Sequence, residues 1–483
     1  MGHVLYQRYM HPTAYRSKYA ELKGWLDKYA DHPGAPTIYN LALRRKPDSW
    51  KAPKKPVSVS IKGTGIAGPP GSDARRLSRK QYNAIRQVTN RVKRLVRRER
   101  PTAALKLVES EQFRRILDPV GFDENLAIIA RGYFHAGKDA EALAIAERAA
   151  ARSGVSAPDA HWWAGLAAWR LNDYEAAATH FSALAGDEKG DAWARSAAAF
   201  WASRAALQAR KPEAVTPMLR IAAQYPQTFY GLLAIQALDE AVPFNWNLPT
   251  LGAVEIDLLQ SPELSRVLLA LVGKANLPDV SLRLGFRMQR NQGETYEAAL
   301  FPVPDWQPQG GYALDKALLF AFMRQESRFR ADARSKAGAK GLMQLMPATA
   351  RYIARGDERF SGRRDLYDPE TNMSLGQKYI RYLIEDPSIG DNLFYMTTAY
   401  NAGPGNLRKW QRQVDYQDDP LLFIESIRSR ETRNFIERVL TNFWIYRLRL
   451  GQDVPSLEAA AAGEWPVYIP FDAATDLSQN HAN

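Results

Sequence analysis

The residue that most strongly suggests chemistry is Glu326, in the stretch "AFMRQESRFRADARSKAGAKGLMQLMPATA" at 321–350. Apolar residues precede it, and the next acid along the chain is Asp332. The apolar sequence at 312–327 predicts a helix with Glu326 in its last turn. A carboxylate there is disfavoured in its charged form by burial and by the helix dipole, so its pKa should rise. A glutamate whose pKa rises to about 6 can act as a general acid for glycosidic cleavage. The simpler alternative is a surface ion pair with Arg324 or Arg328.

The segment "AGAKGLMQLMPATA" at 337–350 contains residues suited to line a ligand-binding cleft beside Glu326. Gly338 and Gly341 allow the backbone to approach a ligand closely. Gln344 offers an amide and Met346 offers a soft apolar surface. These residue types favour a ligand-binding cleft over the simple ion pair.

Two later segments carry further candidates. In "TTAYNAGPGNLRKW", 397–410, a helix that ends at Tyr400 and Asn401 is broken by a Gly-Pro-Gly sequence, which leaves backbone open at a cleft. In "ESIRSRETRNFIERVL", 425–440, Glu431 lies at the start of a predicted helix.

Composition excludes several kinds of site. The chain has no cysteine, which excludes disulfides, zinc–thiolate centres and thiol nucleophiles. The seven histidines form no HExxH motif, and no G-x-S-x-G sequence is present. We therefore expect neither a metal nor another cofactor. No apolar run reaches about 18 residues, so no transmembrane segment is expected. The first 30 residues lack the apolar core of a signal peptide, which indicates either a cytoplasmic protein or a leader removed beforehand.

The net charge of +13 is concentrated in one place. Residues 75–100 contain eleven lysines and arginines against the single acid Glu99, a net charge of +10. Tyr82 is the only aromatic residue there, whereas nucleic-acid-binding surfaces usually interleave aromatics with basic residues, so we expect no nucleic-acid partner. The segment is either a solvated helix face or a docking surface for an anionic polymer, membrane or partner.

An alanine-rich helical repeat covers about 102–240. The segments that begin at His135 and Arg170 share an Asp-x-Glu-Ala sequence, and its first residues, Asp139 and Asp173, lie 34 residues apart. That period is typical of tetratricopeptide helix pairs, which stack into a superhelix. After a proline- and glycine-rich linker at 300–311 the composition changes, which predicts a domain boundary near 301.

Several motifs over roughly 312–446 together resemble those of the soluble lytic transglycosylases of Gram-negative bacteria. They are E-S-x-F, A-x-S-x-x-G-A-x-G-L-M-Q-L-M-P-x-T-A, A-Y-N-A-G and E-T-R. The likeness extends upstream to "YPQTFYGLLA" at 225–234. One difference is that the family commonly reads I-P-x-x-E-T-R, whereas Arg428 stands here in place of the proline.

The resemblance implies a role for each matching residue. Glu326 would be the catalytic acid and base, with Ser335 beside it to position an acetamido group. The residues implied to contact substrate are Ser335, Gln344, Met346, Tyr400, Asn401 and Glu431. We find no second carboxylate to assist Glu326 among Asp332, Asp357 and Glu358, which lie in segments typical of exposed loops.

The resemblance also implies a fold and its divisions. We expect an all-α protein in which a TPR-like α-superhelical region is followed by a mainly α, lysozyme-like catalytic domain. The expected boundaries are 1–255 for the superhelix with an irregular basic insertion at about 45–100, 256–300 for a helical linker domain, 301–450 for the catalytic domain and 451–483 for a C-terminal extension.

The implied activity is cleavage of the bond between N-acetylmuramic acid and N-acetylglucosamine in peptidoglycan, with closure of a 1,6-anhydro ring and no metal. The expected partners are glycan strands and, more loosely, cell-wall or secretion machinery. The implied location is the periplasm. A muramidase on the same fold and a TPR-type scaffold with a vestigial site are the alternatives.

Overall fold

The computed structural model describes residues 5, 8–9, 15–30, 34–56, 77–154, 156–187, 190–248, 264–355, 362 and 365–471. Two compact units are present, Met1–Thr64 and Gly65–Asn483. The described residues form helices and three isolated β-bridges but no strand, so the all-α prediction is confirmed. No helix in these ranges combines the length and the apolar character needed to cross a bilayer.

The first unit contains the helices α2 (Tyr19–Tyr29) and α3 (Ala35–Arg45). They pack through Leu22, Trp25 and Ile38, which are all buried. The sequence that follows, predicted to be irregular, has no helix over 46–56, and Tyr19 donates a hydrogen bond to the Lys51 carbonyl at 2.5 Å. Residues 57–76 of the predicted irregular insertion lie outside the described residues. Its last part is not irregular, because Arg79–Arg97 form a helix with three buried apolar residues on one face.

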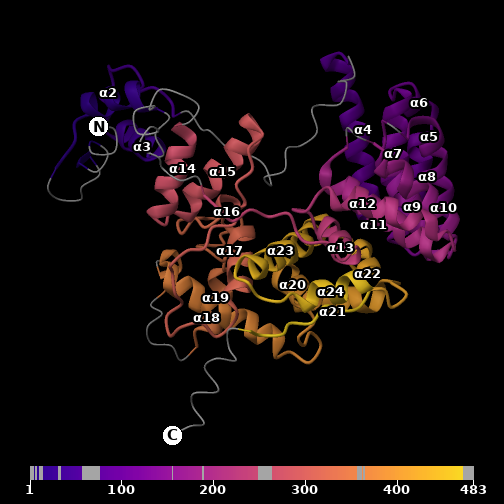
Figure 1. Cartoon of the computed structure of the whole chain (residues 1–483). Coiled ribbons are helices and arrows are strands. Elements are labelled where there is room, and N and C mark those ends of the chain that lie inside the picture. The colour runs from indigo at the N-terminus through magenta and orange to yellow at the C-terminus, as the bar shows by residue number, and fades with distance from the viewer. Residues whose placement is uncertain are drawn as a thin grey trace, which may run out of the picture. The chain divides into compact units, whose positions relative to one another are not determined.

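The second unit begins with a series of helices that pack in sequence order (Figure 1). They are α4 (Arg79–Arg97), α5 (Pro101–Glu109), α6 (Glu111–Arg114), α7 (Pro119–Phe134), α8 (Asp139–Ser153), α9 (Asp159–Arg170), α10 (Tyr174–Ala185), α11 (Ala192–Gln208), α12 (Val215–Ala223) and α13 (Phe229–Ala237). Small residues let them approach closely. A Cβ atom on Gly165 would lie 2.6 Å from the ring of Phe181, so only glycine fits there. Trp169 packs edge-on against Trp201 at 5.0 Å between ring centroids.

One turn geometry recurs at the ends of α4, α7, α9, α11 and α13. In each case a residue in the left-handed conformation follows the helix, and the next backbone N–H donates to the carbonyl five residues earlier at 2.8–3.1 Å. This is the Schellman motif, which satisfies carbonyls that a helix end leaves free. The left-handed residues are Glu99, Gly137, Asn172, Arg210 and Asp239.

These turns correct the repeat length expected from the sequence. The equivalent turn residues Gly137 and Asn172 lie 35 residues apart, and Arg210 follows 38 later. Asp139 is the first residue of α8, whereas Asp173 is the N-cap of α10 and accepts a hydrogen bond from the Ala176 N–H. The spacing of 34 residues therefore aligned acidic residues at positions that are not structurally equivalent. Both the N-cap and the first turn of a helix favour an acidic residue, which explains the apparent match.

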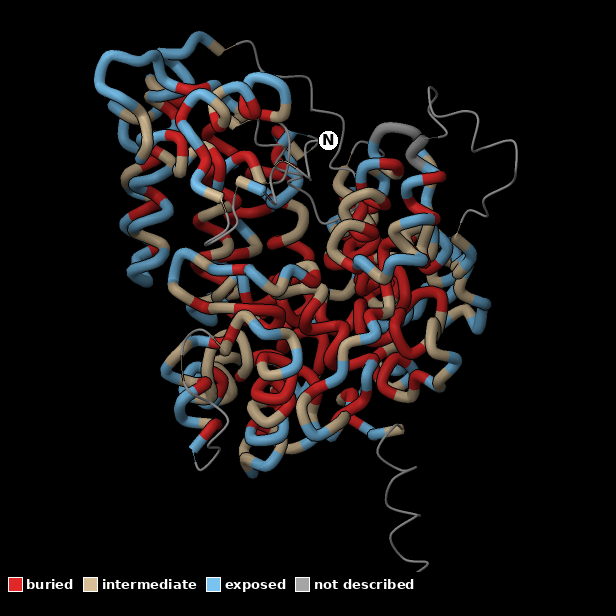
Figure 2. Tube along the Cα trace, turned by 90° about the vertical axis from the view of Figure 1, so that its left-hand side faces the viewer, coloured by how far each residue is buried: buried red, intermediate tan, exposed pale blue. Residues whose placement is uncertain are grey.

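The remaining helices carry the candidate site. They are α14 (Leu264–Lys274), α15 (Pro278–Gln292), α16 (Glu297–Leu300), α17 (Lys316–Glu326), α18 (Pro347–Ile353), α19 (Pro369–Ile384), α20 (Leu393–Ala402), α21 (Pro404–Gln413), α22 (Pro420–Ser426), α23 (Arg430–Arg449) and α24 (Pro455–Ala462). Buried positions of the second unit concentrate where its helices face one another (Figure 2).

Helix α23 packs against α13, α17, α20 and α22. Trp444 and Tyr446 on it are fully buried. Arg447, near its C-terminal end, pairs with Asp315 at 2.6 Å, and both side chains are buried. Asp315 is the N-cap of α17, so the helix predicted at 312–327 begins four residues later, at Lys316.

The α13 helix of the superhelical part packs directly on the part that carries Glu326. The ring of Phe229 stacks on Trp444 at 5.2 Å. The Tyr230 hydroxyl donates to Glu425 Oε1 at 2.6 Å and accepts from Trp201 Nε1 at 3.0 Å. Glu425 is buried, so this hydrogen bond satisfies a carboxylate that water does not reach.

The recurring turn predicts opposite effects at two of its positions. Gly137→Ala should destabilise the fold by about 1 kcal/mol, because alanine disfavours the left-handed conformation. The site has free space, with no atom within 4 Å of the added Cβ, so a clash would not contribute. Arg210→Gly should stabilise by roughly 0.5–1 kcal/mol, since the exposed Arg210 already has a φ of 57°.

Thermal unfolding of the two variants beside the unmodified chain provides the measurement. The two midpoints should move in opposite directions, each by roughly 2 °C. Two shifts of the same sign would show that backbone strain at these turns does not control their stability.

Candidate active site

Glu326 is the last residue of α17, as predicted. The chain reverses immediately after it, because Arg328 and Phe329 both adopt positive φ angles, of 55° and 61°. Two consecutive non-glycine residues in that region are unusual, and such strain persists only where surrounding structure holds it. Phe329 is buried, and its N–H reaches the Met323 carbonyl at 3.5 Å, which holds the reversal in place.

The carboxyl group of Glu326 is poorly solvated. Its side chain is only partly exposed, and burial, together with a smaller contribution from the negative charge of Glu431, raises its pKa to about 8. Glu326 is therefore mostly protonated at pH 7. The pKa is higher than the value near 6 considered from the sequence, chiefly because the carboxyl group is deeply buried, with the charge of Glu431 adding a smaller contribution.

The ion-pair alternative for Glu326 does not hold. Among the described residues no basic side chain pairs with it and it has no hydrogen-bond partner. Arg324 turns away from it and donates to Leu300 O at 2.8 Å and to Asn442 Oδ1 at 2.6 Å. Burial lowers the pKa of Arg324 to about 10, so it is still charged at neutral pH.

Glu431 lies in the first turn of α23 and is exposed. Its effect on the pKa of Glu326 means that the site contains two carboxyl groups, one protonated and one open to solvent. The resemblance assigned Glu431 to the cleft, and the effect of its charge on Glu326 agrees with that assignment. That Glu326 acts as the single acid and base stays a prediction.

Tyr400 joins the same site from α20. Its ring lies 4.5 Å from the ring of Phe322 and stacks on Phe435 at 6.1 Å, between centroids. Its hydroxyl donates to the Met343 carbonyl at 2.8 Å. Burial and the charge of Glu326 raise the pKa of Tyr400 well above its ordinary value, so it stays protonated. It supplies an aromatic wall and ties α20 to the Gly341–Met346 loop.

The predicted residues Ser335 and Gln344 lie in one loop and hold it together. Ser335 Oγ accepts from the Ala339 N–H at 3.0 Å. Gln344 Nε2 donates to Gly341 O at 2.8 Å and to Ala333 O at 3.2 Å, which leaves its carbonyl oxygen available to a ligand. Met346 follows with 41% of its surface exposed, as an apolar contact surface requires.

Asn372 of α19 positions that loop, although no sequence motif indicated it. Its side chain is buried, accepts from the Met343 N–H at 2.8 Å, and donates to Lys340 O at 3.1 Å and Leu366 O at 2.9 Å. A Cβ atom on Gly341 would lie 2.2 Å from its amide nitrogen, so Gly341 must be glycine. Asn372 lies 29 residues from Met343 in the sequence, which explains why local sequence pattern did not indicate its role.

Asn401 is held by the threonine of the E-T-R motif. Thr432 Oγ1 donates to Asn401 Oδ1 at 2.8 Å, which links α20 to α23. Ser429 caps α23 by accepting from the Thr432 N–H at 3.2 Å. In the loop where the family commonly has proline, Arg428 pairs with Glu99 and donates to His135 O at 2.9 Å. These contacts fix the loop before Glu431 without a proline.

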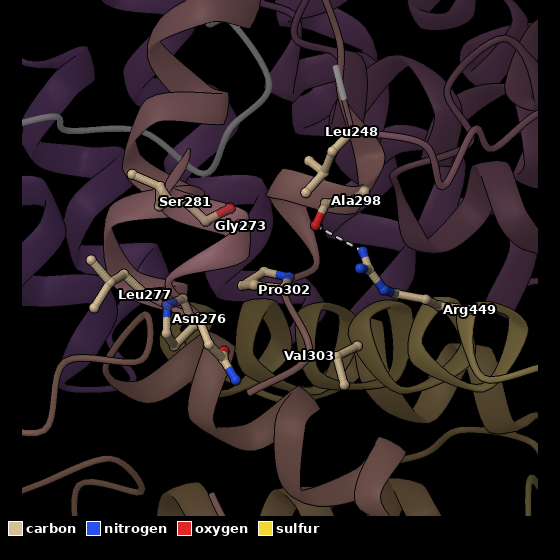
Figure 3. A pocket seen from close by; sticks show the side chains of 11 residues that line it. Leu248, Gly273, Asn276, Leu277, Ser281, Ala298, Pro302, Val303 and Arg449 are labelled. Atoms are coloured by element: carbon tan, nitrogen blue, oxygen red, sulfur yellow. Dashed lines mark hydrogen bonds between the residues drawn. The ribbon is translucent and has the colours of Figure 1, made fainter. Parts of the chain in front are cut away.

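The described residues contain no group of three or more histidine, aspartate or glutamate side chains that could hold a metal ion. His161 and His180 do meet, with 3.1 Å between their Nδ1 atoms, on neighbouring helices of the superhelix. A separate small pocket lies among α14, α15, α16 and the end of α23, where Arg449 donates to Ala298 O at 2.8 Å (Figure 3). Glu326 does not line it.

Comparison with known proteins places residues 307–423 in the family described as "Transglycosylase SLT domain". The soluble lytic murein transglycosylase of Escherichia coli (strain K12) is 36% identical over 157 residues, which are 32% of this chain and 24% of that protein. A putative soluble lytic murein transglycosylase of Haemophilus influenzae is 30% identical over 145 residues, again 24% of its length. The matched region thus spans about a quarter of these curated relatives.

Two solved structures share the fold over a longer range. The 70 kDa soluble lytic transglycosylase SLT70 from Escherichia coli aligns with a TM-score of 0.56 at 18% identity, covering 97% of this chain and 94% of that chain. The lytic transglycosylase Slt from Pseudomonas aeruginosa aligns with a TM-score of 0.55 at 19% identity, covering 90% and 73%. Residues 307–423 thus match an SLT transglycosylase domain, and the likeness to the two solved structures shows that the wider fold is shared.

Proposed function

We propose that this chain is a peptidoglycan lytic transglycosylase that cleaves the β1,4 bond between N-acetylmuramic acid and N-acetylglucosamine. The observation that carries the proposal is a glutamic acid with a pKa of about 8, within the matched SLT domain, beside a tyrosine and a second carboxylate. The murein-cleaving names of the relatives support the choice of substrate. Because that substrate lies in the periplasm of Gram-negative bacteria, we propose the periplasm as the place of action.

In the proposed reaction, Glu326 donates its proton to the bridging oxygen as the bond from that oxygen to C1 breaks. The acetamido group of the muramoyl sugar stabilises the positive charge at C1. The carboxylate of Glu326 then takes the proton of the C6 hydroxyl while O6 bonds to C1, which closes the 1,6-anhydro ring. Glu326 ends protonated, as it began, and no water is consumed.

The surroundings of Glu326 suit both halves of this cycle. Burial makes the ionised form a strong base once the first proton has left, so return of a proton from the hydroxyl is favourable. The exposed carboxylate of Glu431 would stabilise positive charge at C1 during cleavage. Gln344, Met346, Asn401 and the Ser335 loop would contact the sugars on either side of the bond.

A muramidase that uses water is the second candidate, and Glu431 is the observation that favours it. Most glycosidases act with two carboxyl groups, one as the acid and one as base or nucleophile. The two candidates differ in their products, because hydrolysis leaves a reducing muramic end and ring closure leaves an anhydro end that is lighter by one water.

The first test is Glu326→Gln, which keeps the shape of the side chain but cannot donate the proton. Cleavage of purified sacculi should fall by about 10²–10⁴-fold. Asp332→Asn serves as a matched control because it removes an exposed acid close by in sequence, and it should retain activity. Mass spectrometry of the products of the unmodified chain should show anhydro ends, and reducing ends would favour the muramidase.

The second test concerns the dependence on pH. Because the reaction needs protonated Glu326, kcat/KM should fall as pH rises through about 8. Glu431→Gln removes a negative charge that raises the pKa of Glu326, so this alkaline limb should move to lower pH. Burial remains in the variant, and the midpoint should therefore stay above the ordinary value of 4.5.

The pH profile of kcat/KM for the two proteins on a soluble glycan fragment gives the answer, with Asp332→Asn again as the control. An alkaline limb that stays in place or moves upward in the Glu431 variant would contradict the electrostatic coupling of the two groups.

A further inference from the structure

Helix α4 presents a stripe of positive charge that the proposed reaction does not use. Its buried face consists of Ile85, Val88 and Val92, and it packs on α5 and α7. The exposed basic residues between 77 and 100, which we call the α4 stripe, are Arg79, Lys80, Arg86, Arg91, Lys93, Arg94, Arg97, Arg98 and Arg100. Those within the helix lie opposite the buried face along its 19 residues, a length of about 28 Å.

The stripe has almost no internal compensation. Helix α4 contains no acid, and none of its basic side chains forms an ion pair with a described acidic residue. Glu99 is the one acid between 77 and 100, and it pairs with Arg428. Basic residues three or four apart, such as Lys93 and Arg97, repel each other and destabilise the helix. A solvated helix face usually alternates charge signs, so this arrangement indicates an anionic ligand from outside the chain.

The stripe is continuous with the candidate active site. Its C-terminal end is joined through Glu99 to Arg428, which also binds the His135 carbonyl. Three residues after Arg428, Glu431 enters the site beside Glu326. Arg430 between them is exposed and adds another positive charge. A polymer lying in the site can therefore pass from Glu431 over Arg430 and Arg428 onto α4.

The surface chemistry favours a carboxylate-bearing polymer over a membrane or a nucleic acid. The apolar face of α4 is already buried, so it has no hydrophobic side to insert into a bilayer. Tyr82 is the single aromatic ring exposed on it, too few for base stacking. Repeated carboxylates along an otherwise neutral chain suit a row of arginines and lysines, since each contributes a separate charge-assisted hydrogen bond.

We propose that the α4 stripe, with Arg428 and Arg430, is an extended binding track for glycan strands that carry peptide stems with free carboxylates. This inference rests on the proposed function, because it concerns the part of the same polymer that lies outside the cleavage site. It assigns the enzyme to peptide-bearing strands in preference to bare glycan.

The test uses full-length chain with Glu326→Gln, so that the polymer is bound and not digested. One variant adds Arg86→Glu, Lys93→Glu and Arg97→Glu, which lie in line on the exposed face of α4. The matched control adds Arg220→Glu, Lys274→Glu and Arg287→Glu, which reverse three exposed charges on other helices. Co-sedimentation is measured with intact sacculi, with sacculi stripped of their free carboxylates by carbodiimide coupling to excess methylamine, which leaves them insoluble, and with vesicles of phosphatidylglycerol, each over a series of NaCl concentrations.

The Glu326→Gln chain should bind intact sacculi at low salt and lose affinity steeply as salt rises, and it should bind stripped sacculi and vesicles more weakly. The α4 variant should bind intact sacculi about tenfold or more weakly, with a flatter salt dependence, while the control stays within about twofold. Equal binding by the two triple variants, equal binding to stripped sacculi or preference for vesicles would overturn the proposal. The comparison of intact and stripped sacculi needs no change in α4, so a folding defect in the variant cannot obscure the result.

The outcome is separate from that of the proposed function. Digestion of sacculi by the unmodified chain tests the reaction, and carboxylate-dependent binding by the Glu326→Gln chain tests the track. An inert enzyme that still shows carboxylate-dependent binding would disprove only the reaction.

Discussion

The structure depends on keeping the carboxyl group of Glu326 away from water at the edge of the candidate site, where the proposed glycan substrate would reach it. Glu326 meets both conditions because it ends a buried helix and the chain turns back directly behind it. The apolar residues of α17 remove solvent on one side, and Tyr400 closes another. Glu431 then adds a charge that favours the protonated state. A glutamate side chain in water would be ionised at neutral pH. The raised pKa of Glu326 is therefore a product of the surrounding fold.

Helix α23 connects those conditions. Its first turn carries Glu431 into the site and holds Asn401 through Thr432. Further along, Asn442 binds Arg324 and turns that guanidinium away from Glu326. At its far end Arg447 fixes the cap of α17. Helix α23 thus contacts the start of the helix that carries Glu326, orients its Arg324 and adds a charge near its end.

Local pattern in the sequence was sufficient for the all-α fold, the end of α17 at Glu326 and the motifs that form the site. These features depend on neighbouring residues, such as the apolar run before Glu326. The pattern did not reveal the loop-holding role of Asn372, the charge of Glu431 acting on Glu326 or the later start of α17, because each depends on residues from 29 to 132 positions away. The predicted repeat length was one residue too short, because the aligned aspartates occupy different positions relative to the helix start.

The hydrogen bond from Tyr230 to Glu425 has a consequence for any attempt to shorten the protein. Glu425 and Arg433 are buried ionisable groups whose oxygens and nitrogens are 4.0 Å apart at the nearest, and burial raises the pKa of the first and lowers that of the second. Cutting away the superhelical part would leave this couple, and the ring of Trp444, facing solvent on one side. An excised catalytic fragment would therefore need a redesigned outer face, with Glu425 and Trp444 as the first positions to replace.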